Sequence, residues 1–278
     1  MTGDSGIKLT VGIPENNASP HLRPVDYEKP PVVETGFRFT FPPIKGWNMF
    51  HLGLFWARLR ERYPFAEARL PMGSVEFDEL DFRLGPEIHL EALPLRSFLL
   101  DKARNQLLQV QPNVFVRNWK AIEAEHKYCH YSDLKPMFQE DWAAYRQFLK
   151  DESLPEPNVF QCDVTYINHF VKGREWETLE DIGALFPRMK FEFKGALVTS
   201  FSVAATVADN QVRMDAAPAL RPDGTPIIQL TLNVSGKPAS TSEADSWAKL
   251  DDCHKLLVET FAEITSEALQ SNVWKRIR

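Results

Sequence analysis

The order in which two hydrophobic periodicities follow each other constrains the fold more than any other feature of the chain. Residues 32–41 alternate between apolar and polar side chains, a pattern that predicts a half-buried strand. The residues on its apolar face are Val33, Thr35, Phe37, Phe39 and Phe41. A stretch with helical spacing follows from Asn48, a candidate helix cap, to about Tyr63. Three short strands are then predicted at 95–100, 107–111 and 114–119.

A long helical stripe closes this first cycle, with Ser132 as its expected cap. The stripe consists of Leu134, Phe138, Trp142, Tyr145 and Leu149. The same order of elements then follows again. The second cycle has a strand at 159–170, a short helix capped by Thr178, strands at 196–207, 211–217 and 227–234, and a helix at 245–270.

We therefore predict an α+β fold of two β-α-β-β-β-α pseudo-repeats, with antiparallel sheets each covered by a long helix. Sequence identity between the halves is negligible, so the repeat is one of element order. The expected organisation is a flexible N-terminal arm at 1–31, a first half at 32–157 and a second half at 158–278, packed as one globular unit. Residues 70–94 fit either exposed strands or an acidic loop.

Composition narrows the functional classes. The formal net charge of −6 disfavours a broad nucleic-acid surface, because an acidic chain repels phosphates. Three widely separated cysteines indicate reduced thiols and hence a cytoplasmic protein. We expect no signal peptide, and no membrane segment, since no run approaches the roughly 20 apolar residues that a membrane helix needs.

Several segments resemble a sporadically distributed bacterial family of similar length whose function is unknown. They are QVQPNVFVRNW, the strand end TYINHF, and LDDCHKLLVETFAEIT in the last helix. The resemblance covers about residues 30–277, and QVQPNVFVRNW is its most specific part. It implies a bacterial, horizontally exchanged protein, with a context in mobile elements, toxin–antitoxin systems or phage defence. It implies no catalytic residues.

Polar residues at comparable strand positions are the candidate ligand- or partner-binding groups. They are Arg117 and Asn118 in the first half, and Tyr166, Asn168 and His169 in the second, with Arg96, Gln109 and Gln111 in the meander. Buried polar groups are costly unless they are paired. These residues therefore form either a hydrogen-bonded interface network, the interpretation we favour, or a polar pocket.

His126, Cys129 and His130 are weak candidates for a metal site. A tetrahedral zinc site needs four ligands, and no second ligand pair accompanies them, so a polar loop before a helix is the favoured interpretation. Glycine-rich phosphate loops and nucleophile elbows are absent from the sequence, and we expect no cofactor and assign no catalytic residue.

The sequence thus favours a non-enzymatic interaction or regulatory protein of a bacterial mobile-element, toxin–antitoxin or phage-defence system. Its expected partner is a protein, such as the product of a neighbouring gene, or a second copy in a homodimer. Two alternatives stay open: a small-molecule-binding protein with an apolar pocket under the C-terminal helix, and a metal-dependent hydrolase or nuclease.

Overall fold

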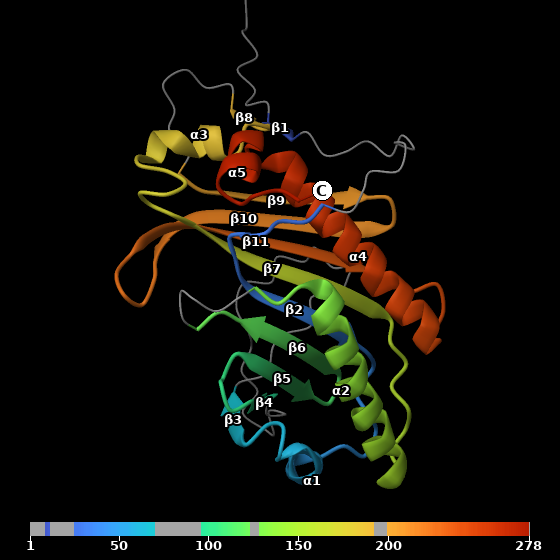
Figure 1. The fold of residues 1–278 in the computed structure, drawn as a ribbon. Coiled ribbons are helices and arrows are strands. Elements are labelled where there is room, and N and C mark those ends of the chain that lie inside the picture. The colour runs from blue at the N-terminus through green and yellow to red at the C-terminus, as the bar shows by residue number, and fades with distance from the viewer. Residues whose placement is uncertain (1–8, 12–24, 70–95, 123–127, 192–198, 278) are drawn as a thin grey trace, which may run out of the picture. The chain divides into compact units, whose positions relative to one another are not determined.

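The computed structural model describes residues 9–11, 25–69, 96–122, 128–191 and 199–277. Figure 1 labels the helices and strands and colours them in chain order. The chain divides into two compact units, and neither unit is one continuous stretch. Unit 1 comprises residues 1–33, 165–234 and 252–278, and unit 2 comprises residues 34–164 and 235–251. Four elements, β2, β7, β11 and α4, each contribute residues to both units.

Nine of the eleven described strands form one large antiparallel sheet, and this mixture of helices with an antiparallel sheet confirms the predicted α+β class. Its strand order is β3-β4-β5-β6-β2-β7-β11-β10-β9, and β1 and β8 pair as a separate two-stranded sheet. The strands are β1 (Leu9–Val11), β2 (Val32–Thr40), β3 (Phe65–Arg69), β4 (Arg96–Leu100), β5 (Gln106–Gln111), β6 (Val114–Lys120), β7 (Gln161–Val171), β8 (Met189–Phe191), β9 (Phe201–Val207), β10 (Asn210–Leu220) and β11 (Pro226–Gly236).

The predicted elements appear in the predicted order. The helices are α1 (Met49–Leu59), α2 (Tyr131–Asp151), α3 (Ile182–Leu185) after the 3₁₀ turn Leu179–Asp181, α4 (Glu243–Ile264) and α5 (Glu267–Asn272). Within the described part of the chain, no helix is both long and apolar enough to cross a membrane.

The core of unit 2 forms where the alternating strand β2 meets the stripe of α2. Phe37, Phe39 and Phe41 are each at most 1% exposed. The Phe39 ring lies 4.9 Å from Phe138 and 5.1 Å from Trp142, between ring centroids. All five predicted stripe residues of α2 are buried. The two periodicities therefore bring one face of β2 against one face of α2, as burial of apolar area requires.

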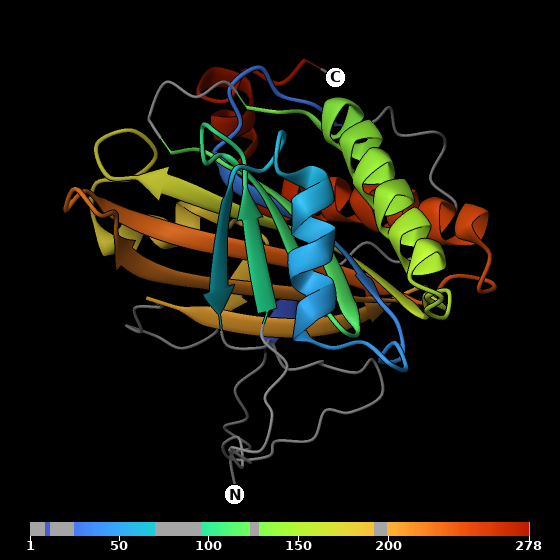
Figure 2. The ribbon, with the colours of Figure 1, turned by 90° about the horizontal axis from the view of Figure 1, so that it is seen from below.

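Helix α1 packs on the same face of the sheet as α2 (Figure 2). The Asn48 side chain caps it by accepting a hydrogen bond of 3.0 Å from the Phe50 amide, as predicted. Its buried residues are Phe55 and Leu59, and Phe55 lies 5.4 Å from the ring of Tyr145. The helix ends at Leu59, earlier than the expected Tyr63.

The start of α4 also belongs to the core of unit 2. The Trp247 ring lies 4.8 Å from Phe39 and 5.2 Å from Phe138. Lys135 of α2 donates two hydrogen bonds of 2.7 Å to the Asp251 carboxylate, and Tyr131 donates a third. The first turns of α4 thus pack against β2 and α2 in the core of unit 2.

Unit 1 contains the rest of α4 and both ends of the described chain. Strand β10 alternates, with Val212, Met214 and Ala216 buried. Tyr27, which the sequence placed in the N-terminal arm, is 6% exposed and packs edge-on against the rings of Phe261 and Trp274.

Three details of the predicted elements are wrong. The cap of α2 is His130, because the helix begins at Tyr131 and Ser132 lies inside it. The C-terminal helix breaks after Ile264, where Ser266 adopts an extended conformation and its amide bonds Leu185 O at 3.0 Å. Ala268, which follows this break, is exposed. Strands β3 and β8 were not predicted, and residues 70–94, expected as exposed strands or an acidic loop, lie outside the described residues.

Candidate functional site

A stripe of polar side chains crosses four neighbouring strands of unit 2. Arg96 Nη1 donates to Gln109 Oε1 at 3.3 Å, and Gln109 Nε2 donates to Asn118 Oδ1 at 2.6 Å. Asn118 Nδ2 in turn donates to Glu34 Oε1 at 3.2 Å. Three of the predicted residues, Arg96, Gln109 and Asn118, therefore belong to one hydrogen-bonded chain, which we call the polar stripe together with Glu34.

The polar stripe lies on the sheet face opposite to α2, since Asn118 alternates with Arg117 and Trp119 on β6. Burial raises the pKa of Glu34, while Lys120 and the Asn118 hydrogen bond act in the opposite direction. Burial lowers the pKa of Arg96, and the nearby Arg69 lowers it further. The buried Arg96 Nε has no hydrogen-bond partner among the described residues.

An ion pair joins Arg38 of β2 to Asp163 of β7. Arg38 Nε and Nη2 each donate to the Asp163 carboxylate at 2.9 Å, a bidentate arrangement. Gln161 and Ser235 donate to the same carboxylate. Because Arg38 follows Glu34 by four residues, both side chains project from the same face of β2.

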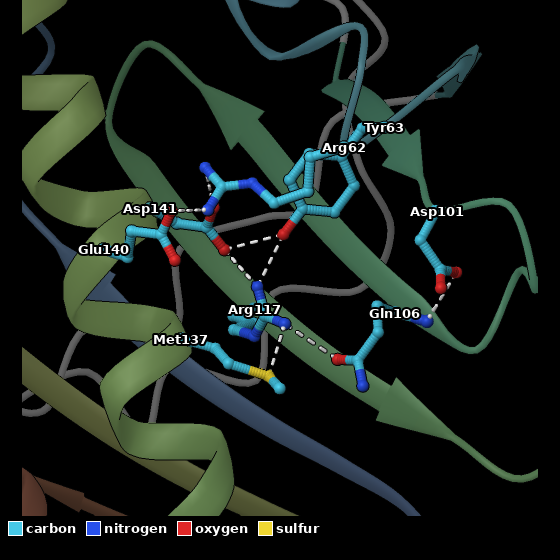
Figure 3. Close-up of polar contacts among 8 residues, drawn as sticks. All are labelled: Arg62, Tyr63, Asp101, Gln106, Arg117, Met137, Glu140 and Asp141. Atoms are coloured by element: carbon cyan, nitrogen blue, oxygen red, sulfur yellow. Dashed lines mark hydrogen bonds and ion pairs between the residues drawn. The ribbon is translucent and has the colours of Figure 1, made fainter.

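Arg117 lies on the other face, under α2, in a buried cluster (Figure 3). Its Nη1 contacts Asp141 Oδ2 and donates to Tyr63 Oη at 2.5 Å. Tyr63 Oη donates to Asp141 Oδ2 at 2.7 Å. Arg117 Nη2 donates to Gln106 Oε1 at 2.9 Å and contacts Met137 Sδ at 3.2 Å. Arg62 extends the cluster, with Nη2 2.9 Å from Asp141 Oδ1.

This cluster balances its charges internally. Two arginines, Arg62 and Arg117, face two carboxylates, Asp141 and Glu140. Burial raises the pKa of Asp141 against the opposing effect of Arg117, and burial also raises the pKa of Tyr63. The arrangement ties β6, α2 and the residues after α1 together. It fits the favoured interpretation of a hydrogen-bonded network at Arg117.

Sequence reasoning missed the partners of Arg117. Asp141 was readable as a charged residue within the apolar stripe of α2, three residues after Phe138 and four before Tyr145. Such a position is costly for a carboxylate unless a cation meets it. Nothing in the pattern indicated that Tyr63 would join it.

The other candidates have separate surroundings. Gln111 is 2% exposed and its Nε2 donates to Asn113 Oδ1 at 3.4 Å across the β5–β6 turn. The remaining three candidates lie in unit 1. The centroid of the Tyr166 ring is 5.9 Å from that of His254. Asn168 Nδ2 donates to Leu230 O at 3.3 Å, and His169 Nδ1 accepts from Arg221 Nε at 3.4 Å.

Of the weak metal candidates, His126 lies outside the described residues. Cys129 is half-buried, and burial, with Asp133 nearby, raises the pKa of its thiol. His130 caps α2, and its ring lies 4.8 Å from that of Tyr128. Across the residues that can be described, no three His, Cys, Asp or Glu side chains are grouped as metal ligands would be.

A shallow hollow of about 450 Å³ lies on β9, β10 and β11 of unit 1. Its lining includes Ser202, Asp215, Gln229 and Thr231, and the Ser202 hydroxyl donates to Asp215 Oδ1 at 2.5 Å. Phe201 and three alanines also line the hollow, and its lining includes no residue of the C-terminal helix, under which the apolar pocket was expected.

Exposed apolar side chains gather at α1 and β3 of unit 2. Met49 is 65% exposed, Phe50 75% and Leu54 48%, and Phe65 follows at 39%. Gly53 lies between Phe50 and Leu54 in the sequence, Ala57 lies three residues after Leu54, and both are also exposed. Helical spacing puts these α1 residues on one face, opposite to Phe55 and Leu59, and we call it the outer face of α1.

No protein-family model matches this sequence, and no curated protein matches it either.

Proposed function

We propose that the protein is a non-enzymatic interaction protein that binds another protein through the outer face of α1. The supporting observation is the exposure of Met49, Phe50 and Leu54 on a helix whose other face is already buried. Large apolar side chains that form a contiguous exposed patch often mark a site of protein–protein interaction. Of the eight large exposed hydrophobic residues in the described part of the chain, four lie between Met49 and Phe65.

The proposal includes a biological setting. The resemblance at QVQPNVFVRNW and in the last helix suggests a bacterial family found with mobile elements, toxin–antitoxin pairs or phage defence. The partner we propose is the product of a neighbouring gene, bound in the bacterial cytoplasm, and the protein would regulate that partner's activity.

We propose in addition that the two halves arose by duplication. Strand order supports this idea, because β4-β5-β6-β2 is followed by β7-β11-β10-β9. In each half the first strand of the cycle is innermost, the last strand of the meander is next to it, and the first strand of the meander is the farthest of the four. Strand β3 lies beyond β4 in the first half, and this sheet has no equivalent strand beyond β9.

Co-expression with the neighbouring genes tests the proposed function. The tagged chain should copurify one neighbouring product at a fixed stoichiometry. The double variant Phe50→Ser/Leu54→Ser should lose that product, because it removes apolar area from the outer face of α1 without touching the core. Leu220→Ser is the matched control, since Leu220 is 70% exposed in unit 1. Capture that is equal for all three proteins would overturn the proposal.

A further inference from the structure

Strand β3 is an edge strand of the large sheet and is the first element after α1 in the sequence. It pairs with β4 on one side, and no other described strand pairs with it. The register sets Phe65 opposite Leu100, Glu67 opposite Phe98 and Arg69 opposite Arg96. An edge strand leaves half of its backbone N–H and C=O groups without sheet partners, and an extended peptide can pair with them.

Three arginines gather on one side of this edge. Arg69 and Arg96 face each other across the β3–β4 pair, with guanidinium carbons 5.7 Å and 4.7 Å from the centre of the Phe98 ring. Arg104 stacks over Phe65 at 4.6 Å. Glu67 is the carboxylate among them, 2.5 Å from Arg69 Nη2 and 3.4 Å from Arg104 Nη1. Among the described residues of this edge, three positive charges face one negative charge.

The arginines are accessible and held in place. The Arg69 side chain is 54% exposed and that of Arg104 is 52% exposed. Stacking on Phe98 and Phe65 fixes the planes of the guanidinium groups, which reduces the entropy lost when they bind a ligand. Arg96 also carries the buried Nε without a hydrogen-bond partner.

Arg104 lies in the turn between β4 and β5 and has a φ of 58°, in the left-handed region that glycine adopts most easily. A non-glycine residue there costs about 1–2 kcal/mol. Ser153, Ala208 and Lys275 also have a positive φ, so this conformation does not by itself mark a binding site.

We propose that the β3 edge binds an acidic peptide segment in an extended conformation, added to the sheet as a further strand. Alternate side chains of a strand face the same side, so every second residue of such a peptide can meet the arginines. Planar guanidinium groups bind carboxylates in pairs of parallel hydrogen bonds. This inference rests on the proposed function, because it names the chemistry that the protein partner presents.

Fluorescence anisotropy with the full chain tests the inference. The probe is a labelled peptide of alternating glutamate and valine, and the comparison peptide has the same charge with its valines replaced by proline. Proline removes the backbone donors needed for strand pairing. The alternating peptide should bind at least about tenfold more tightly than the proline peptide.

Two variants probe the arginines. Arg69→Gln should weaken binding of the alternating peptide about tenfold. Arg104→Gly should weaken it similarly while raising the melting temperature, because glycine relieves the positive φ. A loss of binding by Arg104→Gly therefore cannot be attributed to unfolding. Arg213→Gln, at an exposed arginine of unit 1, should bind like the wild type.

Three outcomes would overturn the inference: wild-type affinity in both arginine variants, equal affinity for the two peptides, or equal competition by a single-stranded oligonucleotide of matched charge. These measurements use synthetic peptides and no cellular partner, so their result does not depend on the result of the copurification. Loss of the partner in Phe50→Ser/Leu54→Ser together with unaltered peptide binding in both arginine variants would keep the proposed function and reject the acidic strand.

Discussion

Arg117 carries a full positive charge on the helix-covered face of the sheet, where its side chain is 4% exposed. Such a charge is tolerated only when its partners replace the water it has lost. The Asp141 carboxylate, the Tyr63 hydroxyl and the Gln106 carbonyl provide these contacts. The cluster is consequently sensitive to the removal of a single partner.

The variant Asp141→Asn should lower the free energy of unfolding by about 3–5 kcal/mol, because it leaves the buried Arg117 without its anion. Urea denaturation followed by tryptophan fluorescence measures this loss. Asp151→Asn, which breaks the exposed pair with Arg58, should leave stability nearly unchanged. The double variant Arg117→Met/Asp141→Leu should recover much of the loss, since it removes both charges together. Equal effects of the two aspartate variants would contradict this view of the cluster.

At the residue scale, strand alternation indicated which polar residues share a face of the sheet, and their role in binding stays a prediction. Arg96, Gln109 and Asn118 were chosen as polar residues of one meander, and they are joined by hydrogen bonds. Asp141 and Tyr63 could not be linked to Arg117 in advance, because the pairing depends on how α2 and the residues after α1 pack on β6.

Among the elements, α1 differs from the other helices because both of its faces carry apolar residues. Gly53 lies in the middle of its outer face, and a methyl group added there would meet no atom within 4 Å. Gly46, just before the helix, has a φ of +88°, and a methyl group there would lie 3.3 Å from Leu154 Cδ2. The same substitution at these two glycines therefore has opposite consequences.

Gly53→Ala should raise the free energy of unfolding by about 1 kcal/mol, because alanine loses less conformational entropy inside a helix. Gly46→Ala should lower it by about 1–2 kcal/mol, because alanine is strained at a positive φ. Chemical denaturation of both variants under identical conditions measures the two changes. A shift in the same direction for both would show that backbone conformation does not control their effects.

Element order was predictable, whereas short elements and helix ends were less so. Strand β3 has the sequence FAEAR, whose two alanines and weak alternation give no clear strand signal. Its pairing with β4 decides its conformation. The break between α4 and α5 was also hidden, because residues 265 and 266 interrupt the helix through a contact of the Ser266 amide with Leu185 O.

On the scale of the whole molecule, each unit is assembled from distant parts of the chain. The predicted halves at 32–157 and 158–278 follow element order, whereas the core of unit 2 includes residues 235–251. Trp247 and Asp251 come from this second segment. A boundary drawn from the sequence alone could not include them, because this contact joins residues more than 100 positions apart.

A fragment of residues 34–164 should therefore be much less stable than the same fragment linked to residues 235–251. The loss of Trp247 from Phe39 and Phe138 removes a contact worth about 3–5 kcal/mol when a buried tryptophan is truncated. Dispersion of amide signals in NMR spectra and the cooperativity of urea unfolding measure the difference. Equal stability of both fragments would mean that the first turns of α4 are dispensable to unit 2.

The polar stripe has a consequence for how the strands find their alignment. Each of the four strands supplies one member, Glu34, Asn118, Gln109 or Arg96, and each hydrogen bond requires its neighbour at a set position along the strand. If one strand slipped by a single residue, its polar member would turn toward the aromatic layer under α2 and leave its neighbours unpaired. The polar stripe therefore lowers the stability of every sheet with a misaligned strand, independently of any binding role of its side chains.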